Sequence, residues 1–236
     1  MPKLIFDIET VGEDFGSIDE TTKFFLTNWL KKESLNEEEY DSALEDIISG
    51  LGFSPLTGEI VSLGILDSEK NQGGVYFQAP GKQIEDFVED NIKFKQMSEL
   101  EILNQFWQIA EKYDEFISFN GRGFDAPFIM IRSAILGIKS TKDLMSNRYL
   151  ERQKFGVIHV DLMDQLSFYG AVRKKGNLHL WSRAFNIPSP KVGGTTGDEV
   201  AKLFSEKKFL DIARYNVRDL RATKELYERW FKYLKF

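Results

Sequence analysis

Alternating apolar and polar positions predict three strands in the first third of the chain. They cover Lys3–Glu9, Glu59–Leu66 and Gly74–Ala79, the second being rich in β-branched residues. The polar segment 67–73 ends in Gly-Gly, which is typical of a hairpin connection. We therefore expect these three strands to be antiparallel neighbours.

Later residues show helical spacing. Ser98-Glu99-Leu100-Glu101 fits a capping box, and the apolar residues after it recur every three or four positions. A buried strand at 116–119 leads into Asn120-Gly121, and Pro127 suits the first turn of a helix that ends at Leu136. The remaining predicted elements are a short strand at 157–160, short helices at 162–168 and 178–185, a helix from a second capping box at Thr196 to 204, and a long helix at 209–234.

This order of elements predicts an α/β fold, in which a mixed β-sheet is flanked by α-helices in the manner of the ribonuclease H-like fold. Residues 13–57 do not fit the order. They carry helical patterns at 22–30 and 37–48 and end in Gly50, Gly52 and Pro55. We interpret 13–57 as a helical, acidic insertion after the first strand. At 236 residues, without an internal repeat, the chain is expected to form a single domain over 1–236.

The composition narrows the class of protein. Twenty Phe indicate a globular chain, and the absence of cysteine excludes disulfides, thiolate zinc sites and a cysteine nucleophile. No apolar run is long enough to span a bilayer, and the N-terminus lacks the regions of a signal peptide. We therefore expect a cytoplasmic protein that makes no contact with membranes, and the sequence names no protein partner.

The charge is unevenly distributed. The net charge of −6 disfavours a nucleic-acid partner, but residues 13–50 hold 11 acids and 3 bases, so the rest of the chain carries −6 − (−8) = +2. Residues 120–175 hold 10 bases and 5 acids, a net of +5. That segment is compatible with a phosphate-binding face, and its candidate phosphate contacts include Arg173-Lys174-Lys175. Ordinary solvated charge explains any single base as well.

Carboxylates stand in three short patterns. Asp7 and Glu9 lie two apart on a strand in Phe6-Asp7-Ile8-Glu9-Thr10, so they share one face. Asp125 ends the pattern Asn120-Gly121-Arg122-Gly123-Phe124-Asp125, and Tyr215 and Asp219 lie one helical turn apart. Each pattern alone has a plain explanation: a chance Asp-x-Glu, a helix N-cap at Asp125, or a core tyrosine beside a surface acid. Together, four acids converging on one point would repel strongly unless cations lay between them, which indicates a two-metal site for phosphodiester chemistry.

These three patterns resemble the motifs of the 3′–5′ exonucleases that use four catalytic acids and a tyrosine, the DEDDy type. The closest resemblance is to the proofreading exonuclease domain of family B DNA polymerases and to stand-alone bacterial relatives of it. It extends from residue 6 to residue 219, nearly the whole chain. The acidic insertion and the low net charge depart from the family pattern, and they bear on the substrate and partner more than on the chemistry.

The resemblance implies a role for each matched residue. Asp7, Glu9, Asp125 and Asp219 would hold two Mg²⁺ or Mn²⁺ ions about 4 Å apart, with Asp7 bridging them. Tyr215 would orient the attacking water, since a tyrosine with a pKa near 10 is a poor base at neutral pH. Thr10, Asn120 and Phe124 are candidates for holding the terminal nucleotides, and Phe124 is equally explained as a core residue. Asp161 and Asp164 are better explained by a helix cap than by a role beside the metal, and His159 as a structural side chain.

The expected function is therefore metal-dependent hydrolysis of phosphodiester bonds at the 3′ end of single-stranded nucleic acid, DNA more than RNA. Two alternatives stay open. The same site could serve an exoribonuclease, because the metal ions act on the phosphate and the 2′-hydroxyl is recognised elsewhere. The fold could also serve a non-catalytic nucleic-acid or protein-binding module, although such a module has no physical reason to keep four mutually repelling carboxylates.

Overall fold

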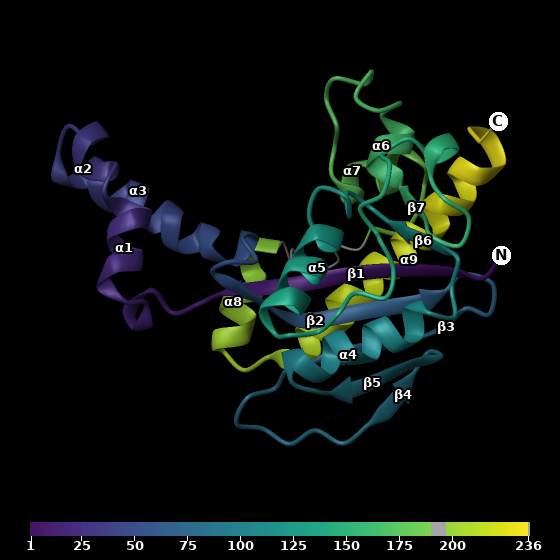
Figure 1. Cartoon of the computed structure of the whole chain (residues 1–236), viewed down its shortest axis with the longest axis horizontal. Helices are drawn as coiled ribbons and strands as arrows, with labels where there is room; N and C mark the ends of the chain where they lie inside the picture. The colour runs from purple at the N-terminus through teal and green to yellow at the C-terminus, as the bar shows by residue number, and fades with distance from the viewer. Residues whose placement is uncertain (190–196, 236) are drawn as a thin grey trace.

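One mixed sheet organises the computed structural model, which describes residues 1–189 and 197–235 (Figure 1). Its seven strands lie in the order β4-β5-β3-β2-β1-β6-β7. The strands are β1 (Lys3–Gly12), β2 (Gly58–Asp67), β3 (Gln72–Phe77), β4 (Phe87–Glu89), β5 (Ile92–Gln96), β6 (Glu115–Ser118) and β7 (Ile158–Asp161). The mixed sheet with flanking helices confirms the predicted fold class.

Strand pairing places β1 at the centre of the fold. It is antiparallel to β2, which is antiparallel to β3, as predicted, and it is parallel to β6 on its other side. Strand β4, at the edge of the sheet, and strand β5 beside it were not predicted. Alternation in Ile92-Lys93-Phe94-Lys95 was the available signal, and Asp90 and Asn91 make the connecting turn with φ values of 48° and 64°.

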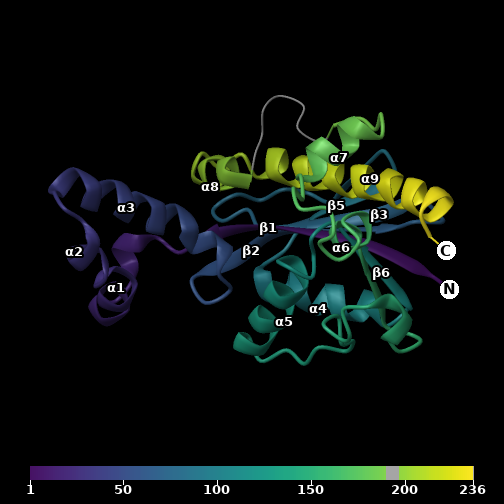
Figure 2. The same ribbon diagram turned by 90° about the horizontal axis from the view of Figure 1, so that it is seen from above.

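Helices cover both faces of the sheet (Figure 2). One face packs against α9 (Phe209–Tyr233), and the other packs against α4 (Glu99–Ala110) and α5 (Asp125–Ile135). Apolar residues of β1 alternate between the two cores, with Ile5 on the side of α9 and Phe6 on the side of α4. The remaining helices outside the insertion are η3 (Leu150–Arg152), α6 (Leu162–Leu166), α7 (Leu178–Ala184) and α8 (Gly197–Ser205). The capping box predicted at Thr196 lies outside the described residues.

The insertion after β1 is helical, as predicted. It contains η1 (Phe15–Ser17), α1 (Glu20–Thr27), α2 (Leu30–Glu33), α3 (Glu37–Gly50) and η2 (Leu51–Phe53). Helices α1–α3 form an arm that projects from the body, while η2 returns to the sheet beside β1 and β2 (Figure 1). Among the described helices, none combines the length and apolarity required to cross a membrane.

Candidate active site

Strand β1 places two acids on the face of the sheet that packs against α9. Asp7 pairs with Gly64 and Glu9 with Ser62 of β2, and a register shift follows between Glu9 and Thr10. Asp219 of α9 meets them there. Carboxylate oxygens of Asp7, Glu9 and Asp219 all lie within 4.8 Å of one another. The structure therefore brings together two of the three sequence patterns.

The third pattern reaches the site through a turn after β6. Asp125 is the first residue of α5, whereas Phe124 occupies the N-cap position, so the N-cap interpretation of Asp125 is wrong. Its carboxylate instead accepts a hydrogen bond of 3.0 Å from the Ile8 backbone N–H, between Asp7 and Glu9. Asp125 is only 4% exposed. It therefore joins the start of α5 to the strand that carries the first two acids.

Asp161 shapes the turn that delivers Asp125. It caps α6 by accepting from the Met163 N–H, and its two oxygens also accept from the N–H groups of Asn120 and Arg122, each at 2.9 Å. The expectation of a cap is therefore confirmed for Asp161, whereas Asp164 lies within α6 and pairs with Arg148. Gly121 is required in this turn, because a Cβ there would lie 2.1 Å from Ser118 Oγ. His159 is buried between Ser118 and the Leu144 carbonyl, in line with its predicted structural role.

Asn216 is a site residue that the sequence analysis missed. Its side chain is fully buried, and Nδ2 donates a 2.7 Å hydrogen bond to Asp7 Oδ2, while Oδ1 has no hydrogen-bond partner in the described structure. Gly64 makes room for it, since a Cβ on Gly64 would lie 2.0 Å from Asn216 Oδ1. A polar residue on the buried stripe of an amphipathic helix was the available signal.

Burial and mutual repulsion disfavour ionisation of the acids. Burial, then the charge of Asp125, raises the pKa of Asp7 well above its ordinary value. Burial, then the charge of Asp219, does the same for Glu9. Burial also raises the pKa of Asp125 to about 7, although its bond from Ile8 opposes the shift. Without cations, ionisation of these acids therefore destabilises the folded protein.

Tyr215 lies against the same acids. It is 5% exposed, its ring lies below the Arg218 guanidinium, and its hydroxyl shares a side-chain hydrogen bond with Asp219. Burial, followed by the charge of Asp219, raises the pKa of the Tyr215 hydroxyl far above its ordinary value. The hydroxyl therefore stays protonated across the physiological range.

A cavity of about 450 Å³ opens onto this cluster. The lining includes Asp7, Asp125, Tyr215 and Asp219. The rest of the lining is Ile8, Phe53, Phe119, Asn120, Gly123, Phe124, Met163, Asn177, Leu178 and His179. Phe53 comes from the end of the insertion and His179 from α7, and neither was predicted. Side chains from six parts of the chain thus form one pocket beside the acids.

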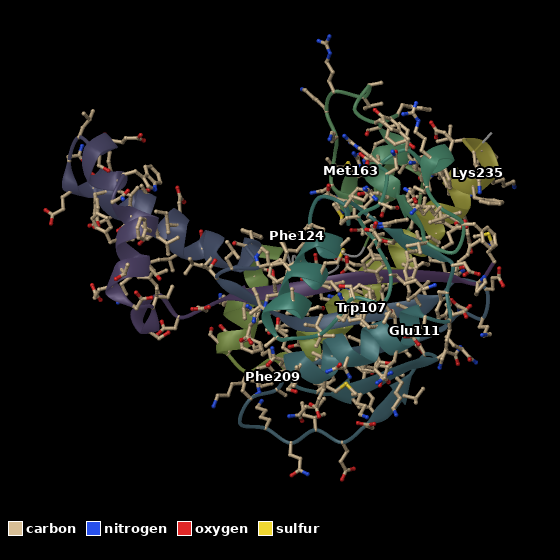
Figure 3. The ribbon with its side chains drawn as sticks, viewed as in Figure 1. Trp107, Glu111, Phe124, Met163, Phe209 and Lys235 are labelled. Carbon is tan, nitrogen blue, oxygen red and sulfur yellow. The ribbon has the colours of Figure 1, made fainter. Side chains whose placement is uncertain are left out.

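The predicted nucleotide-binding residues fall into two groups. Asn120 and Phe124 line the cavity, and the Phe124 ring lies 6.4 Å from that of Phe53 in an edge-to-face arrangement (Phe124 is labelled in Figure 3). Thr10 lines a neighbouring cavity instead, and its hydroxyl donates a 2.7 Å hydrogen bond to the Gly52 carbonyl. That these residues bind nucleotides stays a prediction.

The donor set suits hard divalent cations. Asp7, Glu9 and Asp219 offer carboxylate oxygens to one point, Asp125 adds another from the cavity wall, and no cysteine competes. Cations would also offset the repulsion that raises the pKa values of the acids. The residues present therefore fit a divalent metal centre with oxygen ligands.

Comparison with known proteins agrees with this geometry. Residues 81–235 match the family described as "Predicted 3'-5' exonuclease related to the exonuclease domain of PolB". The chain belongs to this PolB-related exonuclease family. The matched range contains Asp125, Tyr215 and Asp219, whereas Asp7 and Glu9 precede it.

Curated relatives of this chain include three archaeal proteins named as DNA polymerases. The chain is 28% identical to one from Desulfurococcus sp. strain Tok and 27% identical to one from Pyrococcus horikoshii, each over 57% of the chain. It is 26% identical to DNA polymerase 1 of Saccharolobus solfataricus over 93% of the chain. The matches span only 18%, 12% and 26% of those relatives.

A solved structure shares the fold. The family B DNA polymerase of Pyrobaculum calidifontis aligns over 98% of this chain and 24% of its own, with a TM-score of 0.57 and 16% sequence identity. Together with the family match and the polymerase relatives, this shared fold confirms the predicted resemblance to the exonuclease domain of family B DNA polymerases.

Proposed function

We propose that this chain is a metal-dependent 3′–5′ exonuclease, acting as one domain over residues 1–236, that hydrolyses the terminal phosphodiester bond of single-stranded DNA. The observation that carries the proposal is the convergence of the Asp7, Glu9 and Asp219 carboxylates within 4.8 Å, with Asp125 bonded to the backbone between the first two. DNA is favoured over RNA because the three curated relatives are named DNA polymerases.

Each acid would serve as a metal ligand, and the fold would hold it in place. Divalent cations bound there would activate a water and stabilise the leaving 3′ oxygen. Asn216 would fix the orientation of Asp7 through its 2.7 Å hydrogen bond. The bond from Ile8 would keep Asp125 aimed at the same point.

Tyr215 would orient the attacking water. Its raised pKa keeps the hydroxyl protonated, so it can donate a hydrogen bond but is a poor general base. Its hydrogen bond with Asp219 would couple its orientation to a metal ligand.

The cavity walls suggest how a strand would lie. Phe53 and Phe124 offer ring faces and edges for the terminal bases. A smaller cavity of about 330 Å³ shares Asn120 and Gly123 with the first and carries Arg148 and Lys175, although Arg148 is paired with Asp164. We propose that Lys175 contacts a phosphate there.

Digestion of 3′- and 5′-labelled oligonucleotides tests the proposal. Single-stranded DNA and RNA of matched sequence would be incubated with Mg²⁺, with Mn²⁺ or with chelator, beside Asp7→Asn. We expect metal-dependent, stepwise shortening of DNA from the 3′ end by the wild type and none by the variant. Faster digestion of RNA would reassign the substrate. No cleavage of either polymer and no metal binding by calorimetry would instead support a non-catalytic module.

A further inference from the structure

The arm formed by α1–α3 has an unusual surface. No residue of α1 or α3 is buried, yet four large apolar side chains within twelve residues are exposed: Phe24 (60%), Phe25 (70%), Trp29 (44%) and Leu35 (89%). Clustered exposed aromatics mark interaction surfaces, and Trp is enriched among the anchors of protein interfaces.

The arm is also strongly acidic. Residues 20–50, which span α1–α3, hold 8 acids and 3 bases, a net charge of −5, and helix α3 opens with Glu37, Glu38 and Glu39. Within the described part of the arm, the ion pair that forms is Lys23–Glu20. Phosphate groups would be repelled by this surface, so its occupant is expected to be a protein surface that combines apolar and basic groups.

The body of the molecule carries such a surface. A cavity of about 480 Å³, separate from the candidate active site, is lined mainly by apolar and aromatic groups that include Leu150, Phe168 and Trp230. Arg152 and Lys154 are exposed in the segment that follows Leu150, and Lys235 lines the cavity itself. Two acids are present: Glu151 is exposed in the lining, and Glu115 is buried and accepts a hydrogen bond from the Tyr227 hydroxyl. Phe155, 80% exposed, directly follows Lys154 in the chain.

The arm and the cavity lie at opposite ends of the molecule. In both ribbon views the arm extends from one end, whereas the two termini lie at the other (Figures 1 and 2). The cavity belongs to that second end, because Glu115 pairs with Lys3 at the start of β1 and Lys235 lies beside the C-terminus (Lys235 is labelled in Figure 3). One molecule cannot bring its arm to its own cavity in this arrangement.

We propose that the arm of one copy docks into this cavity of a second copy, with Phe25 and Trp29 as apolar anchors and with Arg152 and Lys154 facing the acids of the arm. Two copies side by side in opposite directions would make this contact twice around a two-fold axis. The contact uses no residue of the candidate active site, so it stands or falls independently of the exonuclease proposal.

Analytical ultracentrifugation of the full chain tests the contact. The wild type should sediment as a dimer of the 27.3 kDa chain at high concentration and dissociate in high salt. Phe25→Ser/Trp29→Ser and Arg152→Glu/Lys154→Glu should each weaken association at least tenfold while preserving the circular dichroism spectrum. Leu56→Ser/Val88→Ser and Lys139→Glu/Arg183→Glu are matched controls, because they make similar changes at exposed positions outside the arm and the cavity.

Mixing the two weakened variants gives the decisive result. Each supplies the surface that the other lacks, so one intact arm-to-cavity contact can form in the mixture and in neither variant alone. We expect the mixture to associate at concentrations at which each variant is monomeric. A wild type that is monomeric at every concentration, a dimer that both variants leave intact, or a mixture that fails to associate would each overturn the proposal.

Discussion

Neutralising Asp125 should change how the stability of the metal-free protein depends on pH. The pKa of Asp125 is raised from 3.8 to about 7, chiefly by burial. The folded state therefore binds a proton more tightly than the unfolded chain does. At low pH the Asp125 carboxyl is protonated in both states and does not reduce the free energy of unfolding. As the pH rises from about 4 through about 7, its ionisation lowers that free energy progressively. At about 1.4 kcal/mol per pKa unit, the loss is about 4 kcal/mol at pH 8.

Asp125→Asn removes this loss while keeping an oxygen that can accept from Ile8. Relative to wild type, the variant should gain stability between pH 5 and pH 8, roughly 10 °C in Tm for a chain of this size. Thermal unfolding in chelator across that range measures the gain. Glu111→Gln, an exposed residue outside the site, makes the same charge change and should leave the profile unaltered.

Thermal unfolding can contradict this prediction in two ways. If wild-type stability stays level or rises between pH 5 and pH 8 in chelator, or if Asp125→Asn follows the wild-type profile, burial does not raise the pKa of Asp125 in the folded protein. Added Mg²⁺ should stabilise the wild type at pH 8 more than the variant, because a ligand stabilises only the state that binds it.

Three further substitutions test individual contacts. Tyr215→Phe should slow cleavage roughly 10- to 100-fold and leave metal affinity unchanged by calorimetry; a loss of metal binding would contradict the water-orienting role. Asn216→Leu should weaken metal binding roughly 10- to 100-fold, because Asp7 loses its hydrogen-bond donor, and unaltered affinity would remove Asn216 from the site. Phe53→Ala should raise the KM for oligonucleotides roughly 10-fold with little change in kcat, since stacking contributes about 1–3 kcal/mol per base. The control is Leu56→Ala, because Leu56 is nearby in the sequence and 72% exposed. Equal effects of the two substitutions would exclude stacking by Phe53.

The features that the sequence predicted correctly depend on backbone geometry over a few neighbouring residues. Asp7 and Glu9 share a face because side chains alternate along β1, and Tyr215 and Asp219 share a face because they lie four apart on α9. The antiparallel order of β1, β2 and β3 followed from alternation and a Gly-Gly connection. Strands β4 and β5 were missed because they have only three and five residues, and alternation over so few positions gives a weak periodic signal.

The sequence by itself determined which residues could carry the chemistry and on which element each would stand, since both depend on neighbours within a few positions. Only the tertiary structure decided which of them meet. Asn216 reaches Asp7 across 209 positions, through space that Gly64 leaves open on the adjacent strand. Phe53 enters the cavity because η2 folds back on β1, whereas the hydroxyl of Thr10 is bound to Gly52. Such contacts depend on how whole elements pack, and no local pattern encodes them.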